Sequence, residues 1–225
     1  FSKIKNNNLK VIKGDIRDLD ILNKSLKDID IVIHLACISN DASFELDENL
    51  SKTINYDAFE PLVQISKRNG VSRFLYVSSS SVYGVSDKKD VKEDHPLVPL
   101  TLYNKYKGLC EPILFKYDDA EFCTCILRPA TVCGYAPRQR LDVSVNILTN
   151  LAINTGNIKV FGGDQLRPNL HVQDYSDACI TVVEAPTNKV RKQIFNCGYE
   201  NLSIMEIAKN VKNVLGKQKK LEITI

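Results

Sequence analysis

Short apolar runs alternate along this chain with longer segments in which apolar residues recur every three or four positions. The runs lie at residues 11–12, 31–35, 74–77 and 125–127, and the longer segments at 19–26, 46–68 and 103–117. The longer segments have the spacing of amphipathic helices, and the runs have the composition of buried strands. Strands that are apolar throughout and alternate with helices are typical of a parallel sheet covered on both faces. The pattern therefore predicts an α/β fold built on a doubly wound parallel sheet.

Two prolines fall inside expected helices. Pro61 predicts a kink or break just before it in the helix of residues 46–68, because proline cannot donate the helical hydrogen bond. Pro112 raises the same expectation for the helix of residues 103–117.

The alternation loosens after Gly134, which places the expected domain boundary there. Residues 1–134 are then the sheet domain, and residues 135–225 are mainly a smaller lobe with some segments returning to the sheet. In this lobe we expect helices near residues 142–154 and after Ser203, where a glutamate three residues on has the spacing of a capping box.

The bulk composition limits the class of protein. The 225 residues are 44% hydrophobic, enough for one domain and a smaller lobe. A net charge of +3 is nearly balanced and argues against a nucleic-acid partner. No apolar stretch approaches the ~20 residues needed to cross a bilayer, and no signal peptide is apparent, so we expect no membrane and a cytoplasmic location. The first residue is Phe1 rather than methionine, which indicates a trimmed or partial chain.

The seven cysteines are scattered through apolar surroundings and form no Cys-x-x-Cys pair. Their odd number and their neighbours favour buried free thiols in a reducing compartment. The three histidines are dispersed and have no paired carboxylates beside them, so we expect no metal site. His34 lies inside an apolar run and is expected to be a packed core residue.

Candidate chemistry follows the strand expected at residues 74–77. Ser79 lies two residues after this strand, and Tyr103 and Lys107 lie one helical turn apart on the next helix. The unperturbed tyrosine pKa of ~10 is too high for a base at neutral pH, and a lysine ammonium nearby would lower it. A serine hydroxyl could then share the substrate's oxygen with the tyrosine. In isolation the serine cluster of residues 78–81 reads as a polar turn, but together these groups could move a proton while a nicotinamide moves a hydride.

These fragments resemble the extended short-chain dehydrogenase/reductase superfamily, in its NAD-dependent nucleotide-sugar epimerase/dehydratase branch. The resemblance rests on residues 77–84 and on Tyr103-x-x-x-Lys107 with a glutamate four residues on. Supporting segments run through most of the chain in the family's order: residues 14–18, 32–36, Asn55, 127–131 and 167–174. The resemblance implies a Rossmann-like sheet, a nucleotide-sugar substrate, NAD as cofactor (NADP not excluded) and a homodimer that forms through the helices around Pro61 and Tyr103.

The resemblance also implies roles for residues at matching positions. Tyr103 would be the catalytic base, with Lys107 lowering its pKa and holding the nicotinamide ribose, and Ser79 would be the catalytic hydroxyl that also contacts substrate. The cofactor contacts implied are Asp15, Ile16, Leu35, Ala36, Asn55, Lys107 and Pro129. The further substrate contacts implied are Thr131, Asn146 and Arg167, the last pairing with phosphates through its forked donors.

Two serines decide among the reactions of the family. In the 4,6-dehydratases an acidic pair follows the catalytic hydroxyl residue, whereas Ser80 and Ser81 stand at those positions here. A serine cannot supply the proton chemistry of a carboxyl group. We therefore expect an epimerase, most simply one acting at C4 of a hexose through a transient keto-sugar. The alternatives are an NAD(P)H-dependent keto-sugar reductase, a 4,6-dehydratase, and a non-catalytic protein that binds sugar-nucleotides.

The chain departs from the family at its amino end. The family opens with a strand and a Gly-x-x-Gly-x-x-Gly turn that holds the cofactor pyrophosphate, but the first glycine here is Gly14. We expect the sheet to lack its first βαβ unit and to leave an exposed edge. We also predict that this 225-residue polypeptide by itself binds NAD poorly; calorimetric titration tests this, and a micromolar dissociation constant would contradict it.

Overall fold

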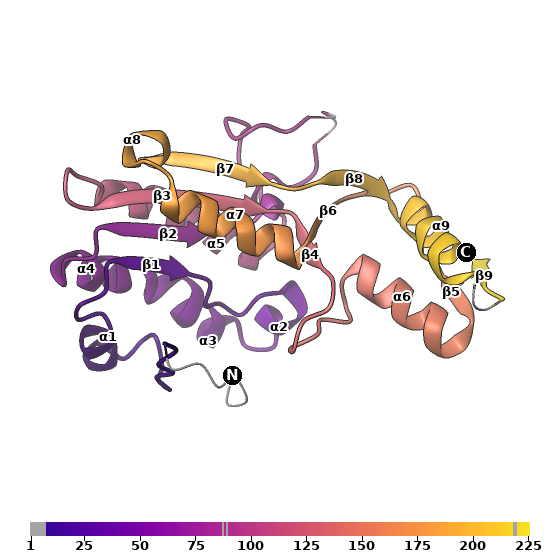
Figure 1. Ribbon diagram of the computed structural model, residues 1–225, viewed down its shortest axis with the longest axis horizontal. Helices are drawn as coiled ribbons and strands as arrows, with labels where there is room; N and C mark the ends of the chain where they lie inside the picture. The colour runs from indigo at the N-terminus through magenta and orange to yellow at the C-terminus, as the bar shows by residue number, and fades with distance from the viewer. Residues whose placement is uncertain (1–7, 87, 89, 218–219) are drawn as a thin grey trace.

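A parallel sheet of four strands, in the order β1-β2-β3-β7, is the main sheet of the molecule and lies in the left half of Figure 1. The strands are β1 Ile31–His34, β2 Arg73–Val77, β3 Cys123–Pro129 and β7 Gln193–Cys197. The computed structural model describes residues 8–86, 88, 90–217 and 220–225, so the start of the chain at Phe1 lies outside the described residues. Strands β2 and β3 are buried almost throughout, as the unbroken apolar runs predicted.

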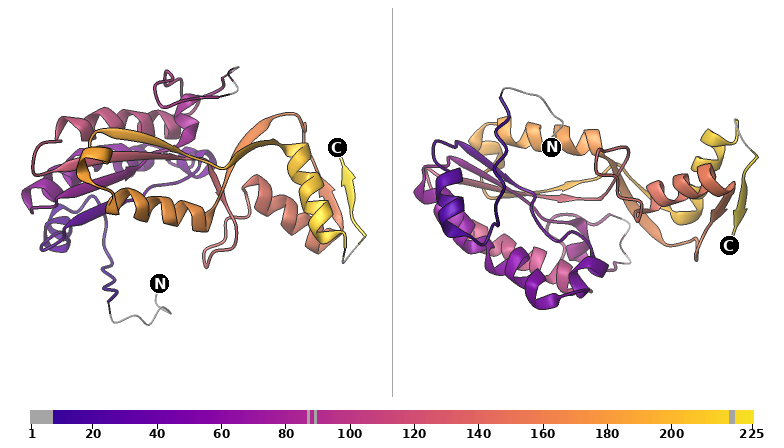
Figure 2. Two further views of the ribbon diagram at one scale, coloured as in Figure 1. Left: turned by 45° about the horizontal axis from the view of Figure 1, so that its top comes forward. Right: turned by 90° about the horizontal axis from the view of Figure 1, so that it is seen from below.

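Helices cover both faces of this sheet, which confirms the doubly wound prediction (Figure 2). On one face lie α1 Leu19–Ser25, α4 Phe59–Arg68 and α5 Leu102–Lys116, and on the other lies α7 Val172–Glu184, with the short α8 Thr187–Val190 after it. Alternate strand residues supply the two cores. Phe74, Tyr76 and Ile126 pack with the first group of helices, while Leu75 and Leu127 pack towards α7.

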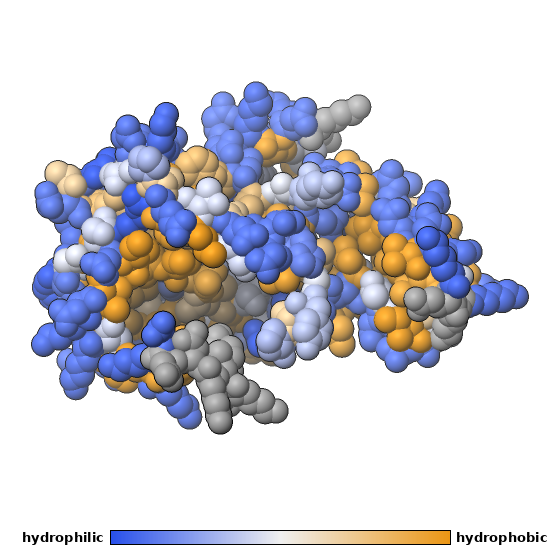
Figure 3. Space-filling view, viewed as in Figure 1, coloured by the Kyte–Doolittle hydropathy of each residue, from blue (hydrophilic) through white to orange (hydrophobic). Residues whose placement is uncertain are grey.

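The strand expected at residues 11–12 does not form, and this prediction is wrong. Val11 and Ile12 are 61% and 48% exposed in a segment that belongs to no helix or strand. An apolar run becomes a strand only where a neighbouring strand accepts its hydrogen bonds. Strand β1 is therefore an edge of the sheet, and its residues Ile31 and Ile33 remain substantially exposed. Apolar side chains gather around this edge in the space-filling view (Figure 3).

The helix expected at residues 46–68 is interrupted, as Pro61 predicted. It consists of α3 Glu48–Lys52, a π-helical turn Thr53–Asp57 and α4, which begins two residues before Pro61. The proline thus lies in the first turn of α4, where its missing N–H would have no helical partner. A further short helix, α2 Asp41–Glu45, precedes this series. In contrast, α5 continues through Pro112.

A second set of elements lies beyond the carboxyl end of the sheet (Figure 1). A three-stranded sheet consists of β4 Thr131–Cys133, β6 Leu166–His171 and β8 Glu200–Ser203, and a two-stranded one of β5 Asn157–Lys159 and β9 Glu222–Thr224. Helices α6 Ser144–Thr155 and α9 Ile204–Leu215 pack together around a separate apolar cluster. Helix α9 begins with the predicted capping box, in which Ser203 and Glu206 bond each other's backbone N–H groups.

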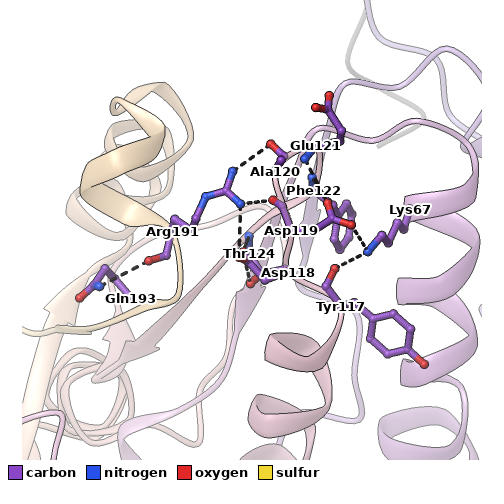
Figure 4. A network of polar contacts seen from close by, with 10 residues as sticks. All are labelled: Lys67, Tyr117, Asp118, Asp119, Ala120, Glu121, Phe122, Thr124, Arg191 and Gln193. Atoms are coloured by element: carbon purple, nitrogen blue, oxygen red, sulfur yellow. Dashed lines mark hydrogen bonds and ion pairs between the residues drawn. The ribbon is translucent and has the colours of Figure 1, made fainter.

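A polar network joins strands β3 and β7 at the amino end of the sheet (Figure 4). The Arg191 guanidinium bonds the carbonyl oxygens of Asp119 and Ala120 and lies 3.3 Å from the Asp118 carboxylate. Asp118 in turn accepts hydrogen bonds from the backbone N–H and hydroxyl of Thr124, at 2.8 and 2.9 Å. These contacts fix the turn between α5 and β3 at the end of the sheet that carries no candidate chemistry.

All seven cysteines are free. Cys110, Cys123, Cys125 and Cys179 are buried as expected. Cys37, Cys133 and Cys197 are only half-buried: Cys133 and Cys197 are the last residues of β4 and β7, and Cys37 lies just past β1. In the described part of the chain, no helix combines the length and the apolar character needed to cross a membrane.

His34 is the packed core residue that the sequence predicted. It is 8% exposed, and its ring lies 5.6 to 6.3 Å from those of Phe59, Phe74 and Tyr76. Burial lowers the pKa of its imidazole to about 3, and the Lys107 ammonium acts in the same direction.

This imidazole should make stability depend on pH. Below the unfolded pKa of ~6.5, the imidazole binds a proton in the unfolded chain but not in the folded chain. The free energy of unfolding therefore decreases as the pH is lowered from ~6.5 towards the folded pKa. The slope contributed is at most ~1.4 kcal/mol per pH unit. Urea unfolding between about pH 6.5 and pH 5 should show a steeper loss for the wild type than for His34→Leu. Parallel slopes would contradict this prediction.

Candidate active site

A cleft of about 620 Å³ opens at the carboxyl ends of the parallel strands. This is where ligands bind in open α/β sheets. Its walls come from the ends of β1, β2 and β3, from the first turn of α5, and from the segment between β4 and α6. The sequence-predicted residues that line it are Leu35, Ser79, Tyr103, Lys107, Pro129, Thr131, Asn146 and Arg167. The fold thus brings together all three residues expected to be catalytic.

Ser79 is positioned by a tight turn after β2. Its backbone is extended, and its side-chain oxygen accepts a hydrogen bond from the N–H of Ser81 at 3.1 Å, which begins the 3-10 turn Ser80–Tyr83. The hydroxyl is half-buried at the wall of the cleft.

Tyr103 and Lys107 lie in the first turns of α5. The helix begins at Thr101, whose hydroxyl accepts a hydrogen bond from the N–H of Asn104 and donates one to Asp41 at 2.6 Å. Lys107 is 5% exposed, and its ammonium donates to the carbonyl oxygen of Val77 at 2.8 Å. The backbone that leads into Ser79 is therefore tied directly to the helix that carries Tyr103.

The pKa of Tyr103 corrects one expectation. Burial raises this pKa above its ordinary value, Cys37 and Asp41 act in the same direction, and Arg140 opposes them. The predicted lowering is wrong for this structure, because desolvation outweighs the nearby positive charge and the Lys107 ammonium is engaged by a carbonyl oxygen.

Four of the expected cofactor residues do not line the cleft. Asp15 and Ile16 lie in the segment before α1, where the Asp15 carboxylate pairs with Arg17 at 2.6 Å. Ala36 is exposed just past β1. The Asn55 side chain is buried, and its amide both accepts from and donates to the backbone of Ile38, at 2.8 and 3.0 Å. Asn55 thus shapes the loop after β1 rather than facing the cleft.

The expected substrate residues lie on the opposite wall. Asn146 accepts from the N–H of Gly134 at 3.1 Å and donates to the carbonyl oxygen of Arg140 at 2.7 Å, so its amide holds the segment between β4 and α6. Arg167 on β6 is exposed, and its guanidinium donates a hydrogen bond to the adjacent carbonyl oxygen of Leu166 at 3.0 Å. Thr131 is half-buried on β4.

Unpaired polar atoms concentrate in this cleft. Among the described residues, four buried side-chain oxygens have no hydrogen-bond partner, and three of these belong to cleft residues: Ser78, Asn104 and Ser144. Buried polar groups are normally paired, and an exception needs a physical reason. A ligand carrying hydrogen-bonding groups would supply the partners.

The sequence reasoning missed four charged residues of the cleft, Asp41, Arg138, Arg140 and Asp142, and two of them, Arg140 and Asp41, act on the pKa of Tyr103. Arg140 lies in the segment between β4 and α6, pairs with Asp142 at 2.5 Å and reaches the carbonyl oxygen of Ser39. Asp41 begins α2 and faces the cleft beside Tyr103. Neither follows a strand run, so periodicity could not mark them; the only signal for Arg140 was a pair of arginines after Pro137.

A doubly wound parallel sheet with this cleft at its carboxyl edge places the chain in the Rossmann-like class of folds. A model of the NAD dependent epimerase/dehydratase family matches residues 2–198. The chain therefore belongs to the NAD dependent epimerase/dehydratase family, whose members are enzymes.

Individual relatives carry out related reactions. The chain is 29% identical to a UDP-glucose 4-epimerase of Lactobacillus helveticus over 91% of its own length and 69% of the relative's. It is 29% identical to a dTDP-D-glucose 4,6-dehydratase of Mus musculus, over 91% of this chain and 58% of that one. The crystal structure of the UDP-glucuronic acid 4-epimerase of Bacillus cereus with UDP-glucuronic acid and NAD is similar with a TM-score of 0.84 and 29% identity, over 97% of this chain and 69% of that one.

Proposed function

We propose that this chain is the catalytic part of an NAD-dependent epimerase that inverts C4 of a sugar in a nucleotide-diphosphate sugar. The observation that supports this best is the single cleft that holds Ser79, Tyr103 and Lys107 on one wall and Arg167 on the other. On this proposal, residues 1–134 are mainly the cofactor domain and residues 135–225 mainly the substrate lobe.

In this mechanism NAD, when bound, would supply the acceptor for the C4 hydride and the donor that returns it to the opposite face of the transient keto-sugar. Tyr103 takes the proton of the C4 hydroxyl and gives it back, which requires its pKa to fall from the raised value of this structure when the cleft is occupied. Ser79 hydrogen-bonds the same oxygen and orients it. Both residues are fixed to one another, because Lys107 binds the carbonyl of Val77 two residues before Ser79.

The described residues fit a nicotinamide nucleotide. Leu35, Lys107 and Pro129 line the cleft at the sheet side, and the unpaired oxygens of Ser78 and Asn104 offer hydrogen-bond partners there. Asp15, Ile16 and Ala36 would contribute at the edge of the sheet, and Asn55 would act through the loop it holds.

The other wall of the cleft suits a nucleotide-sugar. We propose that the exposed Arg167 guanidinium pairs with the diphosphate, because its forked donors match phosphate oxygens. Thr131 and Asn146 would face the sugar-nucleotide, Asn146 chiefly by shaping the segment between β4 and α6.

The acidic residues of the cleft favour epimerisation over dehydration. Ser80 and Ser81 follow Ser79, and among the described lining residues the carboxylates are Asp41 and Asp142. Asp142 is paired with Arg140, and Asp41 accepts the Thr101 hydroxyl. No lining carboxylate is therefore free to supply the acid that water elimination needs.

A dimer completes the proposal. We propose that its interface lies on the helices around Pro61 and Tyr103, which is consistent with Leu109 of α5 being 40% exposed. Sedimentation equilibrium of the complete gene product tests this.

The test of the proposed reaction is proton NMR of the complete gene product with NAD and UDP-glucose or UDP-glucuronic acid. We expect the C4-inverted sugar at equilibrium with its precursor and no net change in NADH. A 4-keto-6-deoxy product would indicate a dehydratase, and consumption of NADH with a keto-sugar would indicate a reductase.

Two charge-neutralising variants should move the pH dependence of kcat in opposite directions. Arg140 lowers the pKa of Tyr103 and Asp41 raises it. The base works only when deprotonated, so Arg140→Gln should shift the acid limb of the profile to higher pH and Asp41→Asn to lower pH. Shifts in the same direction, or none, would contradict the assignment of Tyr103 as the titrating base.

A further inference from the structure

The face of α5 that packs on the sheet carries charged residues where apolar ones would be usual. Glu111, one turn beyond Lys107, is 3% exposed and meets Arg128 of β3, which is also 3% exposed. The contact is two-pronged: Arg128 Nε lies 3.0 Å from Glu111 Oε1, and Nη2 lies 2.6 Å from Oε2. This fork fixes both the height and the rotation of α5 relative to β3.

The same guanidinium holds the segment that carries Ser79. Its Nη1 donates to the hydroxyl of Tyr83 at 2.7 Å, and it stacks on that ring at 4.8 Å. Nη1 also donates to the carbonyl of Glu93 at 2.9 Å. The Tyr83 hydroxyl in turn donates a hydrogen bond to the side-chain oxygen of Asn196 on β7 at 2.7 Å.

One side chain therefore joins three segments that meet at the cleft. Tyr83 ends the turn that begins beside Ser79, Glu111 lies two turns along α5 from Tyr103, and Arg128 directly precedes Pro129. We propose that Arg128 is a positioning residue, which sets the separation of the Ser79 and Tyr103 hydroxyls through Tyr83 and Glu111. The inference rests on the proposed function for its kinetic consequence.

A purely stabilising role does not account for this arrangement. Two desolvated charges are a costly way to stabilise a core, and well-packed apolar residues often do as well or better. What the pair adds is directional contact, because a guanidinium binds three partners at fixed angles and a lysine ammonium cannot span them.

The test compares Arg128→Lys with a matched control, Arg73→Lys, in the complete gene product. Arg73 is also buried, at 9% exposure, but it bonds Val182, Val183 and Thr187 at the far end of α7. We expect Arg128→Lys to lower kcat by about 10- to 100-fold with KM for the nucleotide-sugar unchanged, since small misplacements cost rates of this order. Arg73→Lys should keep the wild-type kcat per folded molecule. Equal kcat in both variants would overturn the proposal.

A second variant guards against loss of folding. Tyr83→Phe removes one hydroxyl from the network and should lower kcat less than Arg128→Lys, again with KM unchanged; a wild-type kcat would count against the inference.

Hydrogen exchange separates this inference from the proposed function. Arg128→Lys should speed exchange in the Ser80–Tyr83 turn and the first turn of α5, whereas Arg73→Lys should not. If the wild type lacks epimerase activity, the proposed function fails while this result still decides the positioning role. Unchanged exchange in both segments would overturn it.

Discussion

Tyr103→Phe should lower kcat by about 10²- to 10⁴-fold, the range that a positioned proton-transfer group contributes. The substitution removes only the hydroxyl, and KM should change little because the ring remains. The matched control is Tyr106→Phe, one turn along the same helix, whose ring packs on Phe44 and Tyr56. Steady-state turnover of the complete gene product measures both. Full activity of Tyr103→Phe, or equal losses in the two variants, would refute the role assigned to Tyr103.

Glu111→Leu alone should lower the free energy of unfolding by about 3–5 kcal/mol, because it leaves the buried Arg128 guanidinium without its counter-charge. The double variant with Arg128→Met should recover most of this loss, since both charges are then gone. Urea unfolding measures both changes. A double variant as unstable as the single one would contradict the assigned pairing.

The same double variant separates stability from positioning. It should fold well but have a low kcat, because no guanidinium remains to join α5 to the turn after Ser79. Recovery of kcat together with stability would mean that the ion pair only stabilises the fold.

The sequence predicted the elements that are set by local pattern. The apolar runs at β2 and β3 were recognisable because these strands are buried on both faces, and the break before Pro61 followed from its missing donor. The run at Val11 had the same composition but formed no strand, because strand formation depends on a partner that local pattern does not describe.

The candidate site was predictable in part for a similar reason. Carboxyl ends of parallel strands share one edge, so Ser79 and Tyr103 could be placed together from topology. The state of Tyr103 could not be predicted, because it depends on burial and on charges that loops bring near. Arg140 lies 37 residues after Tyr103 in the sequence, and Asp41 lies 62 residues before Tyr103. The contact of Asn55 with the backbone of Ile38 could not be predicted either, because sequence spacing does not determine the direction of a side chain.

The most direct test of the central claim follows deuterium placed at C4 of the nucleotide-sugar in the complete gene product. If hydride passes to bound NAD and returns to the other face of the same sugar, the C4-inverted product retains the deuterium in ordinary water. Loss of the label to solvent, with inversion still occurring, would contradict the proposed transfer of hydride between the sugar and bound NAD.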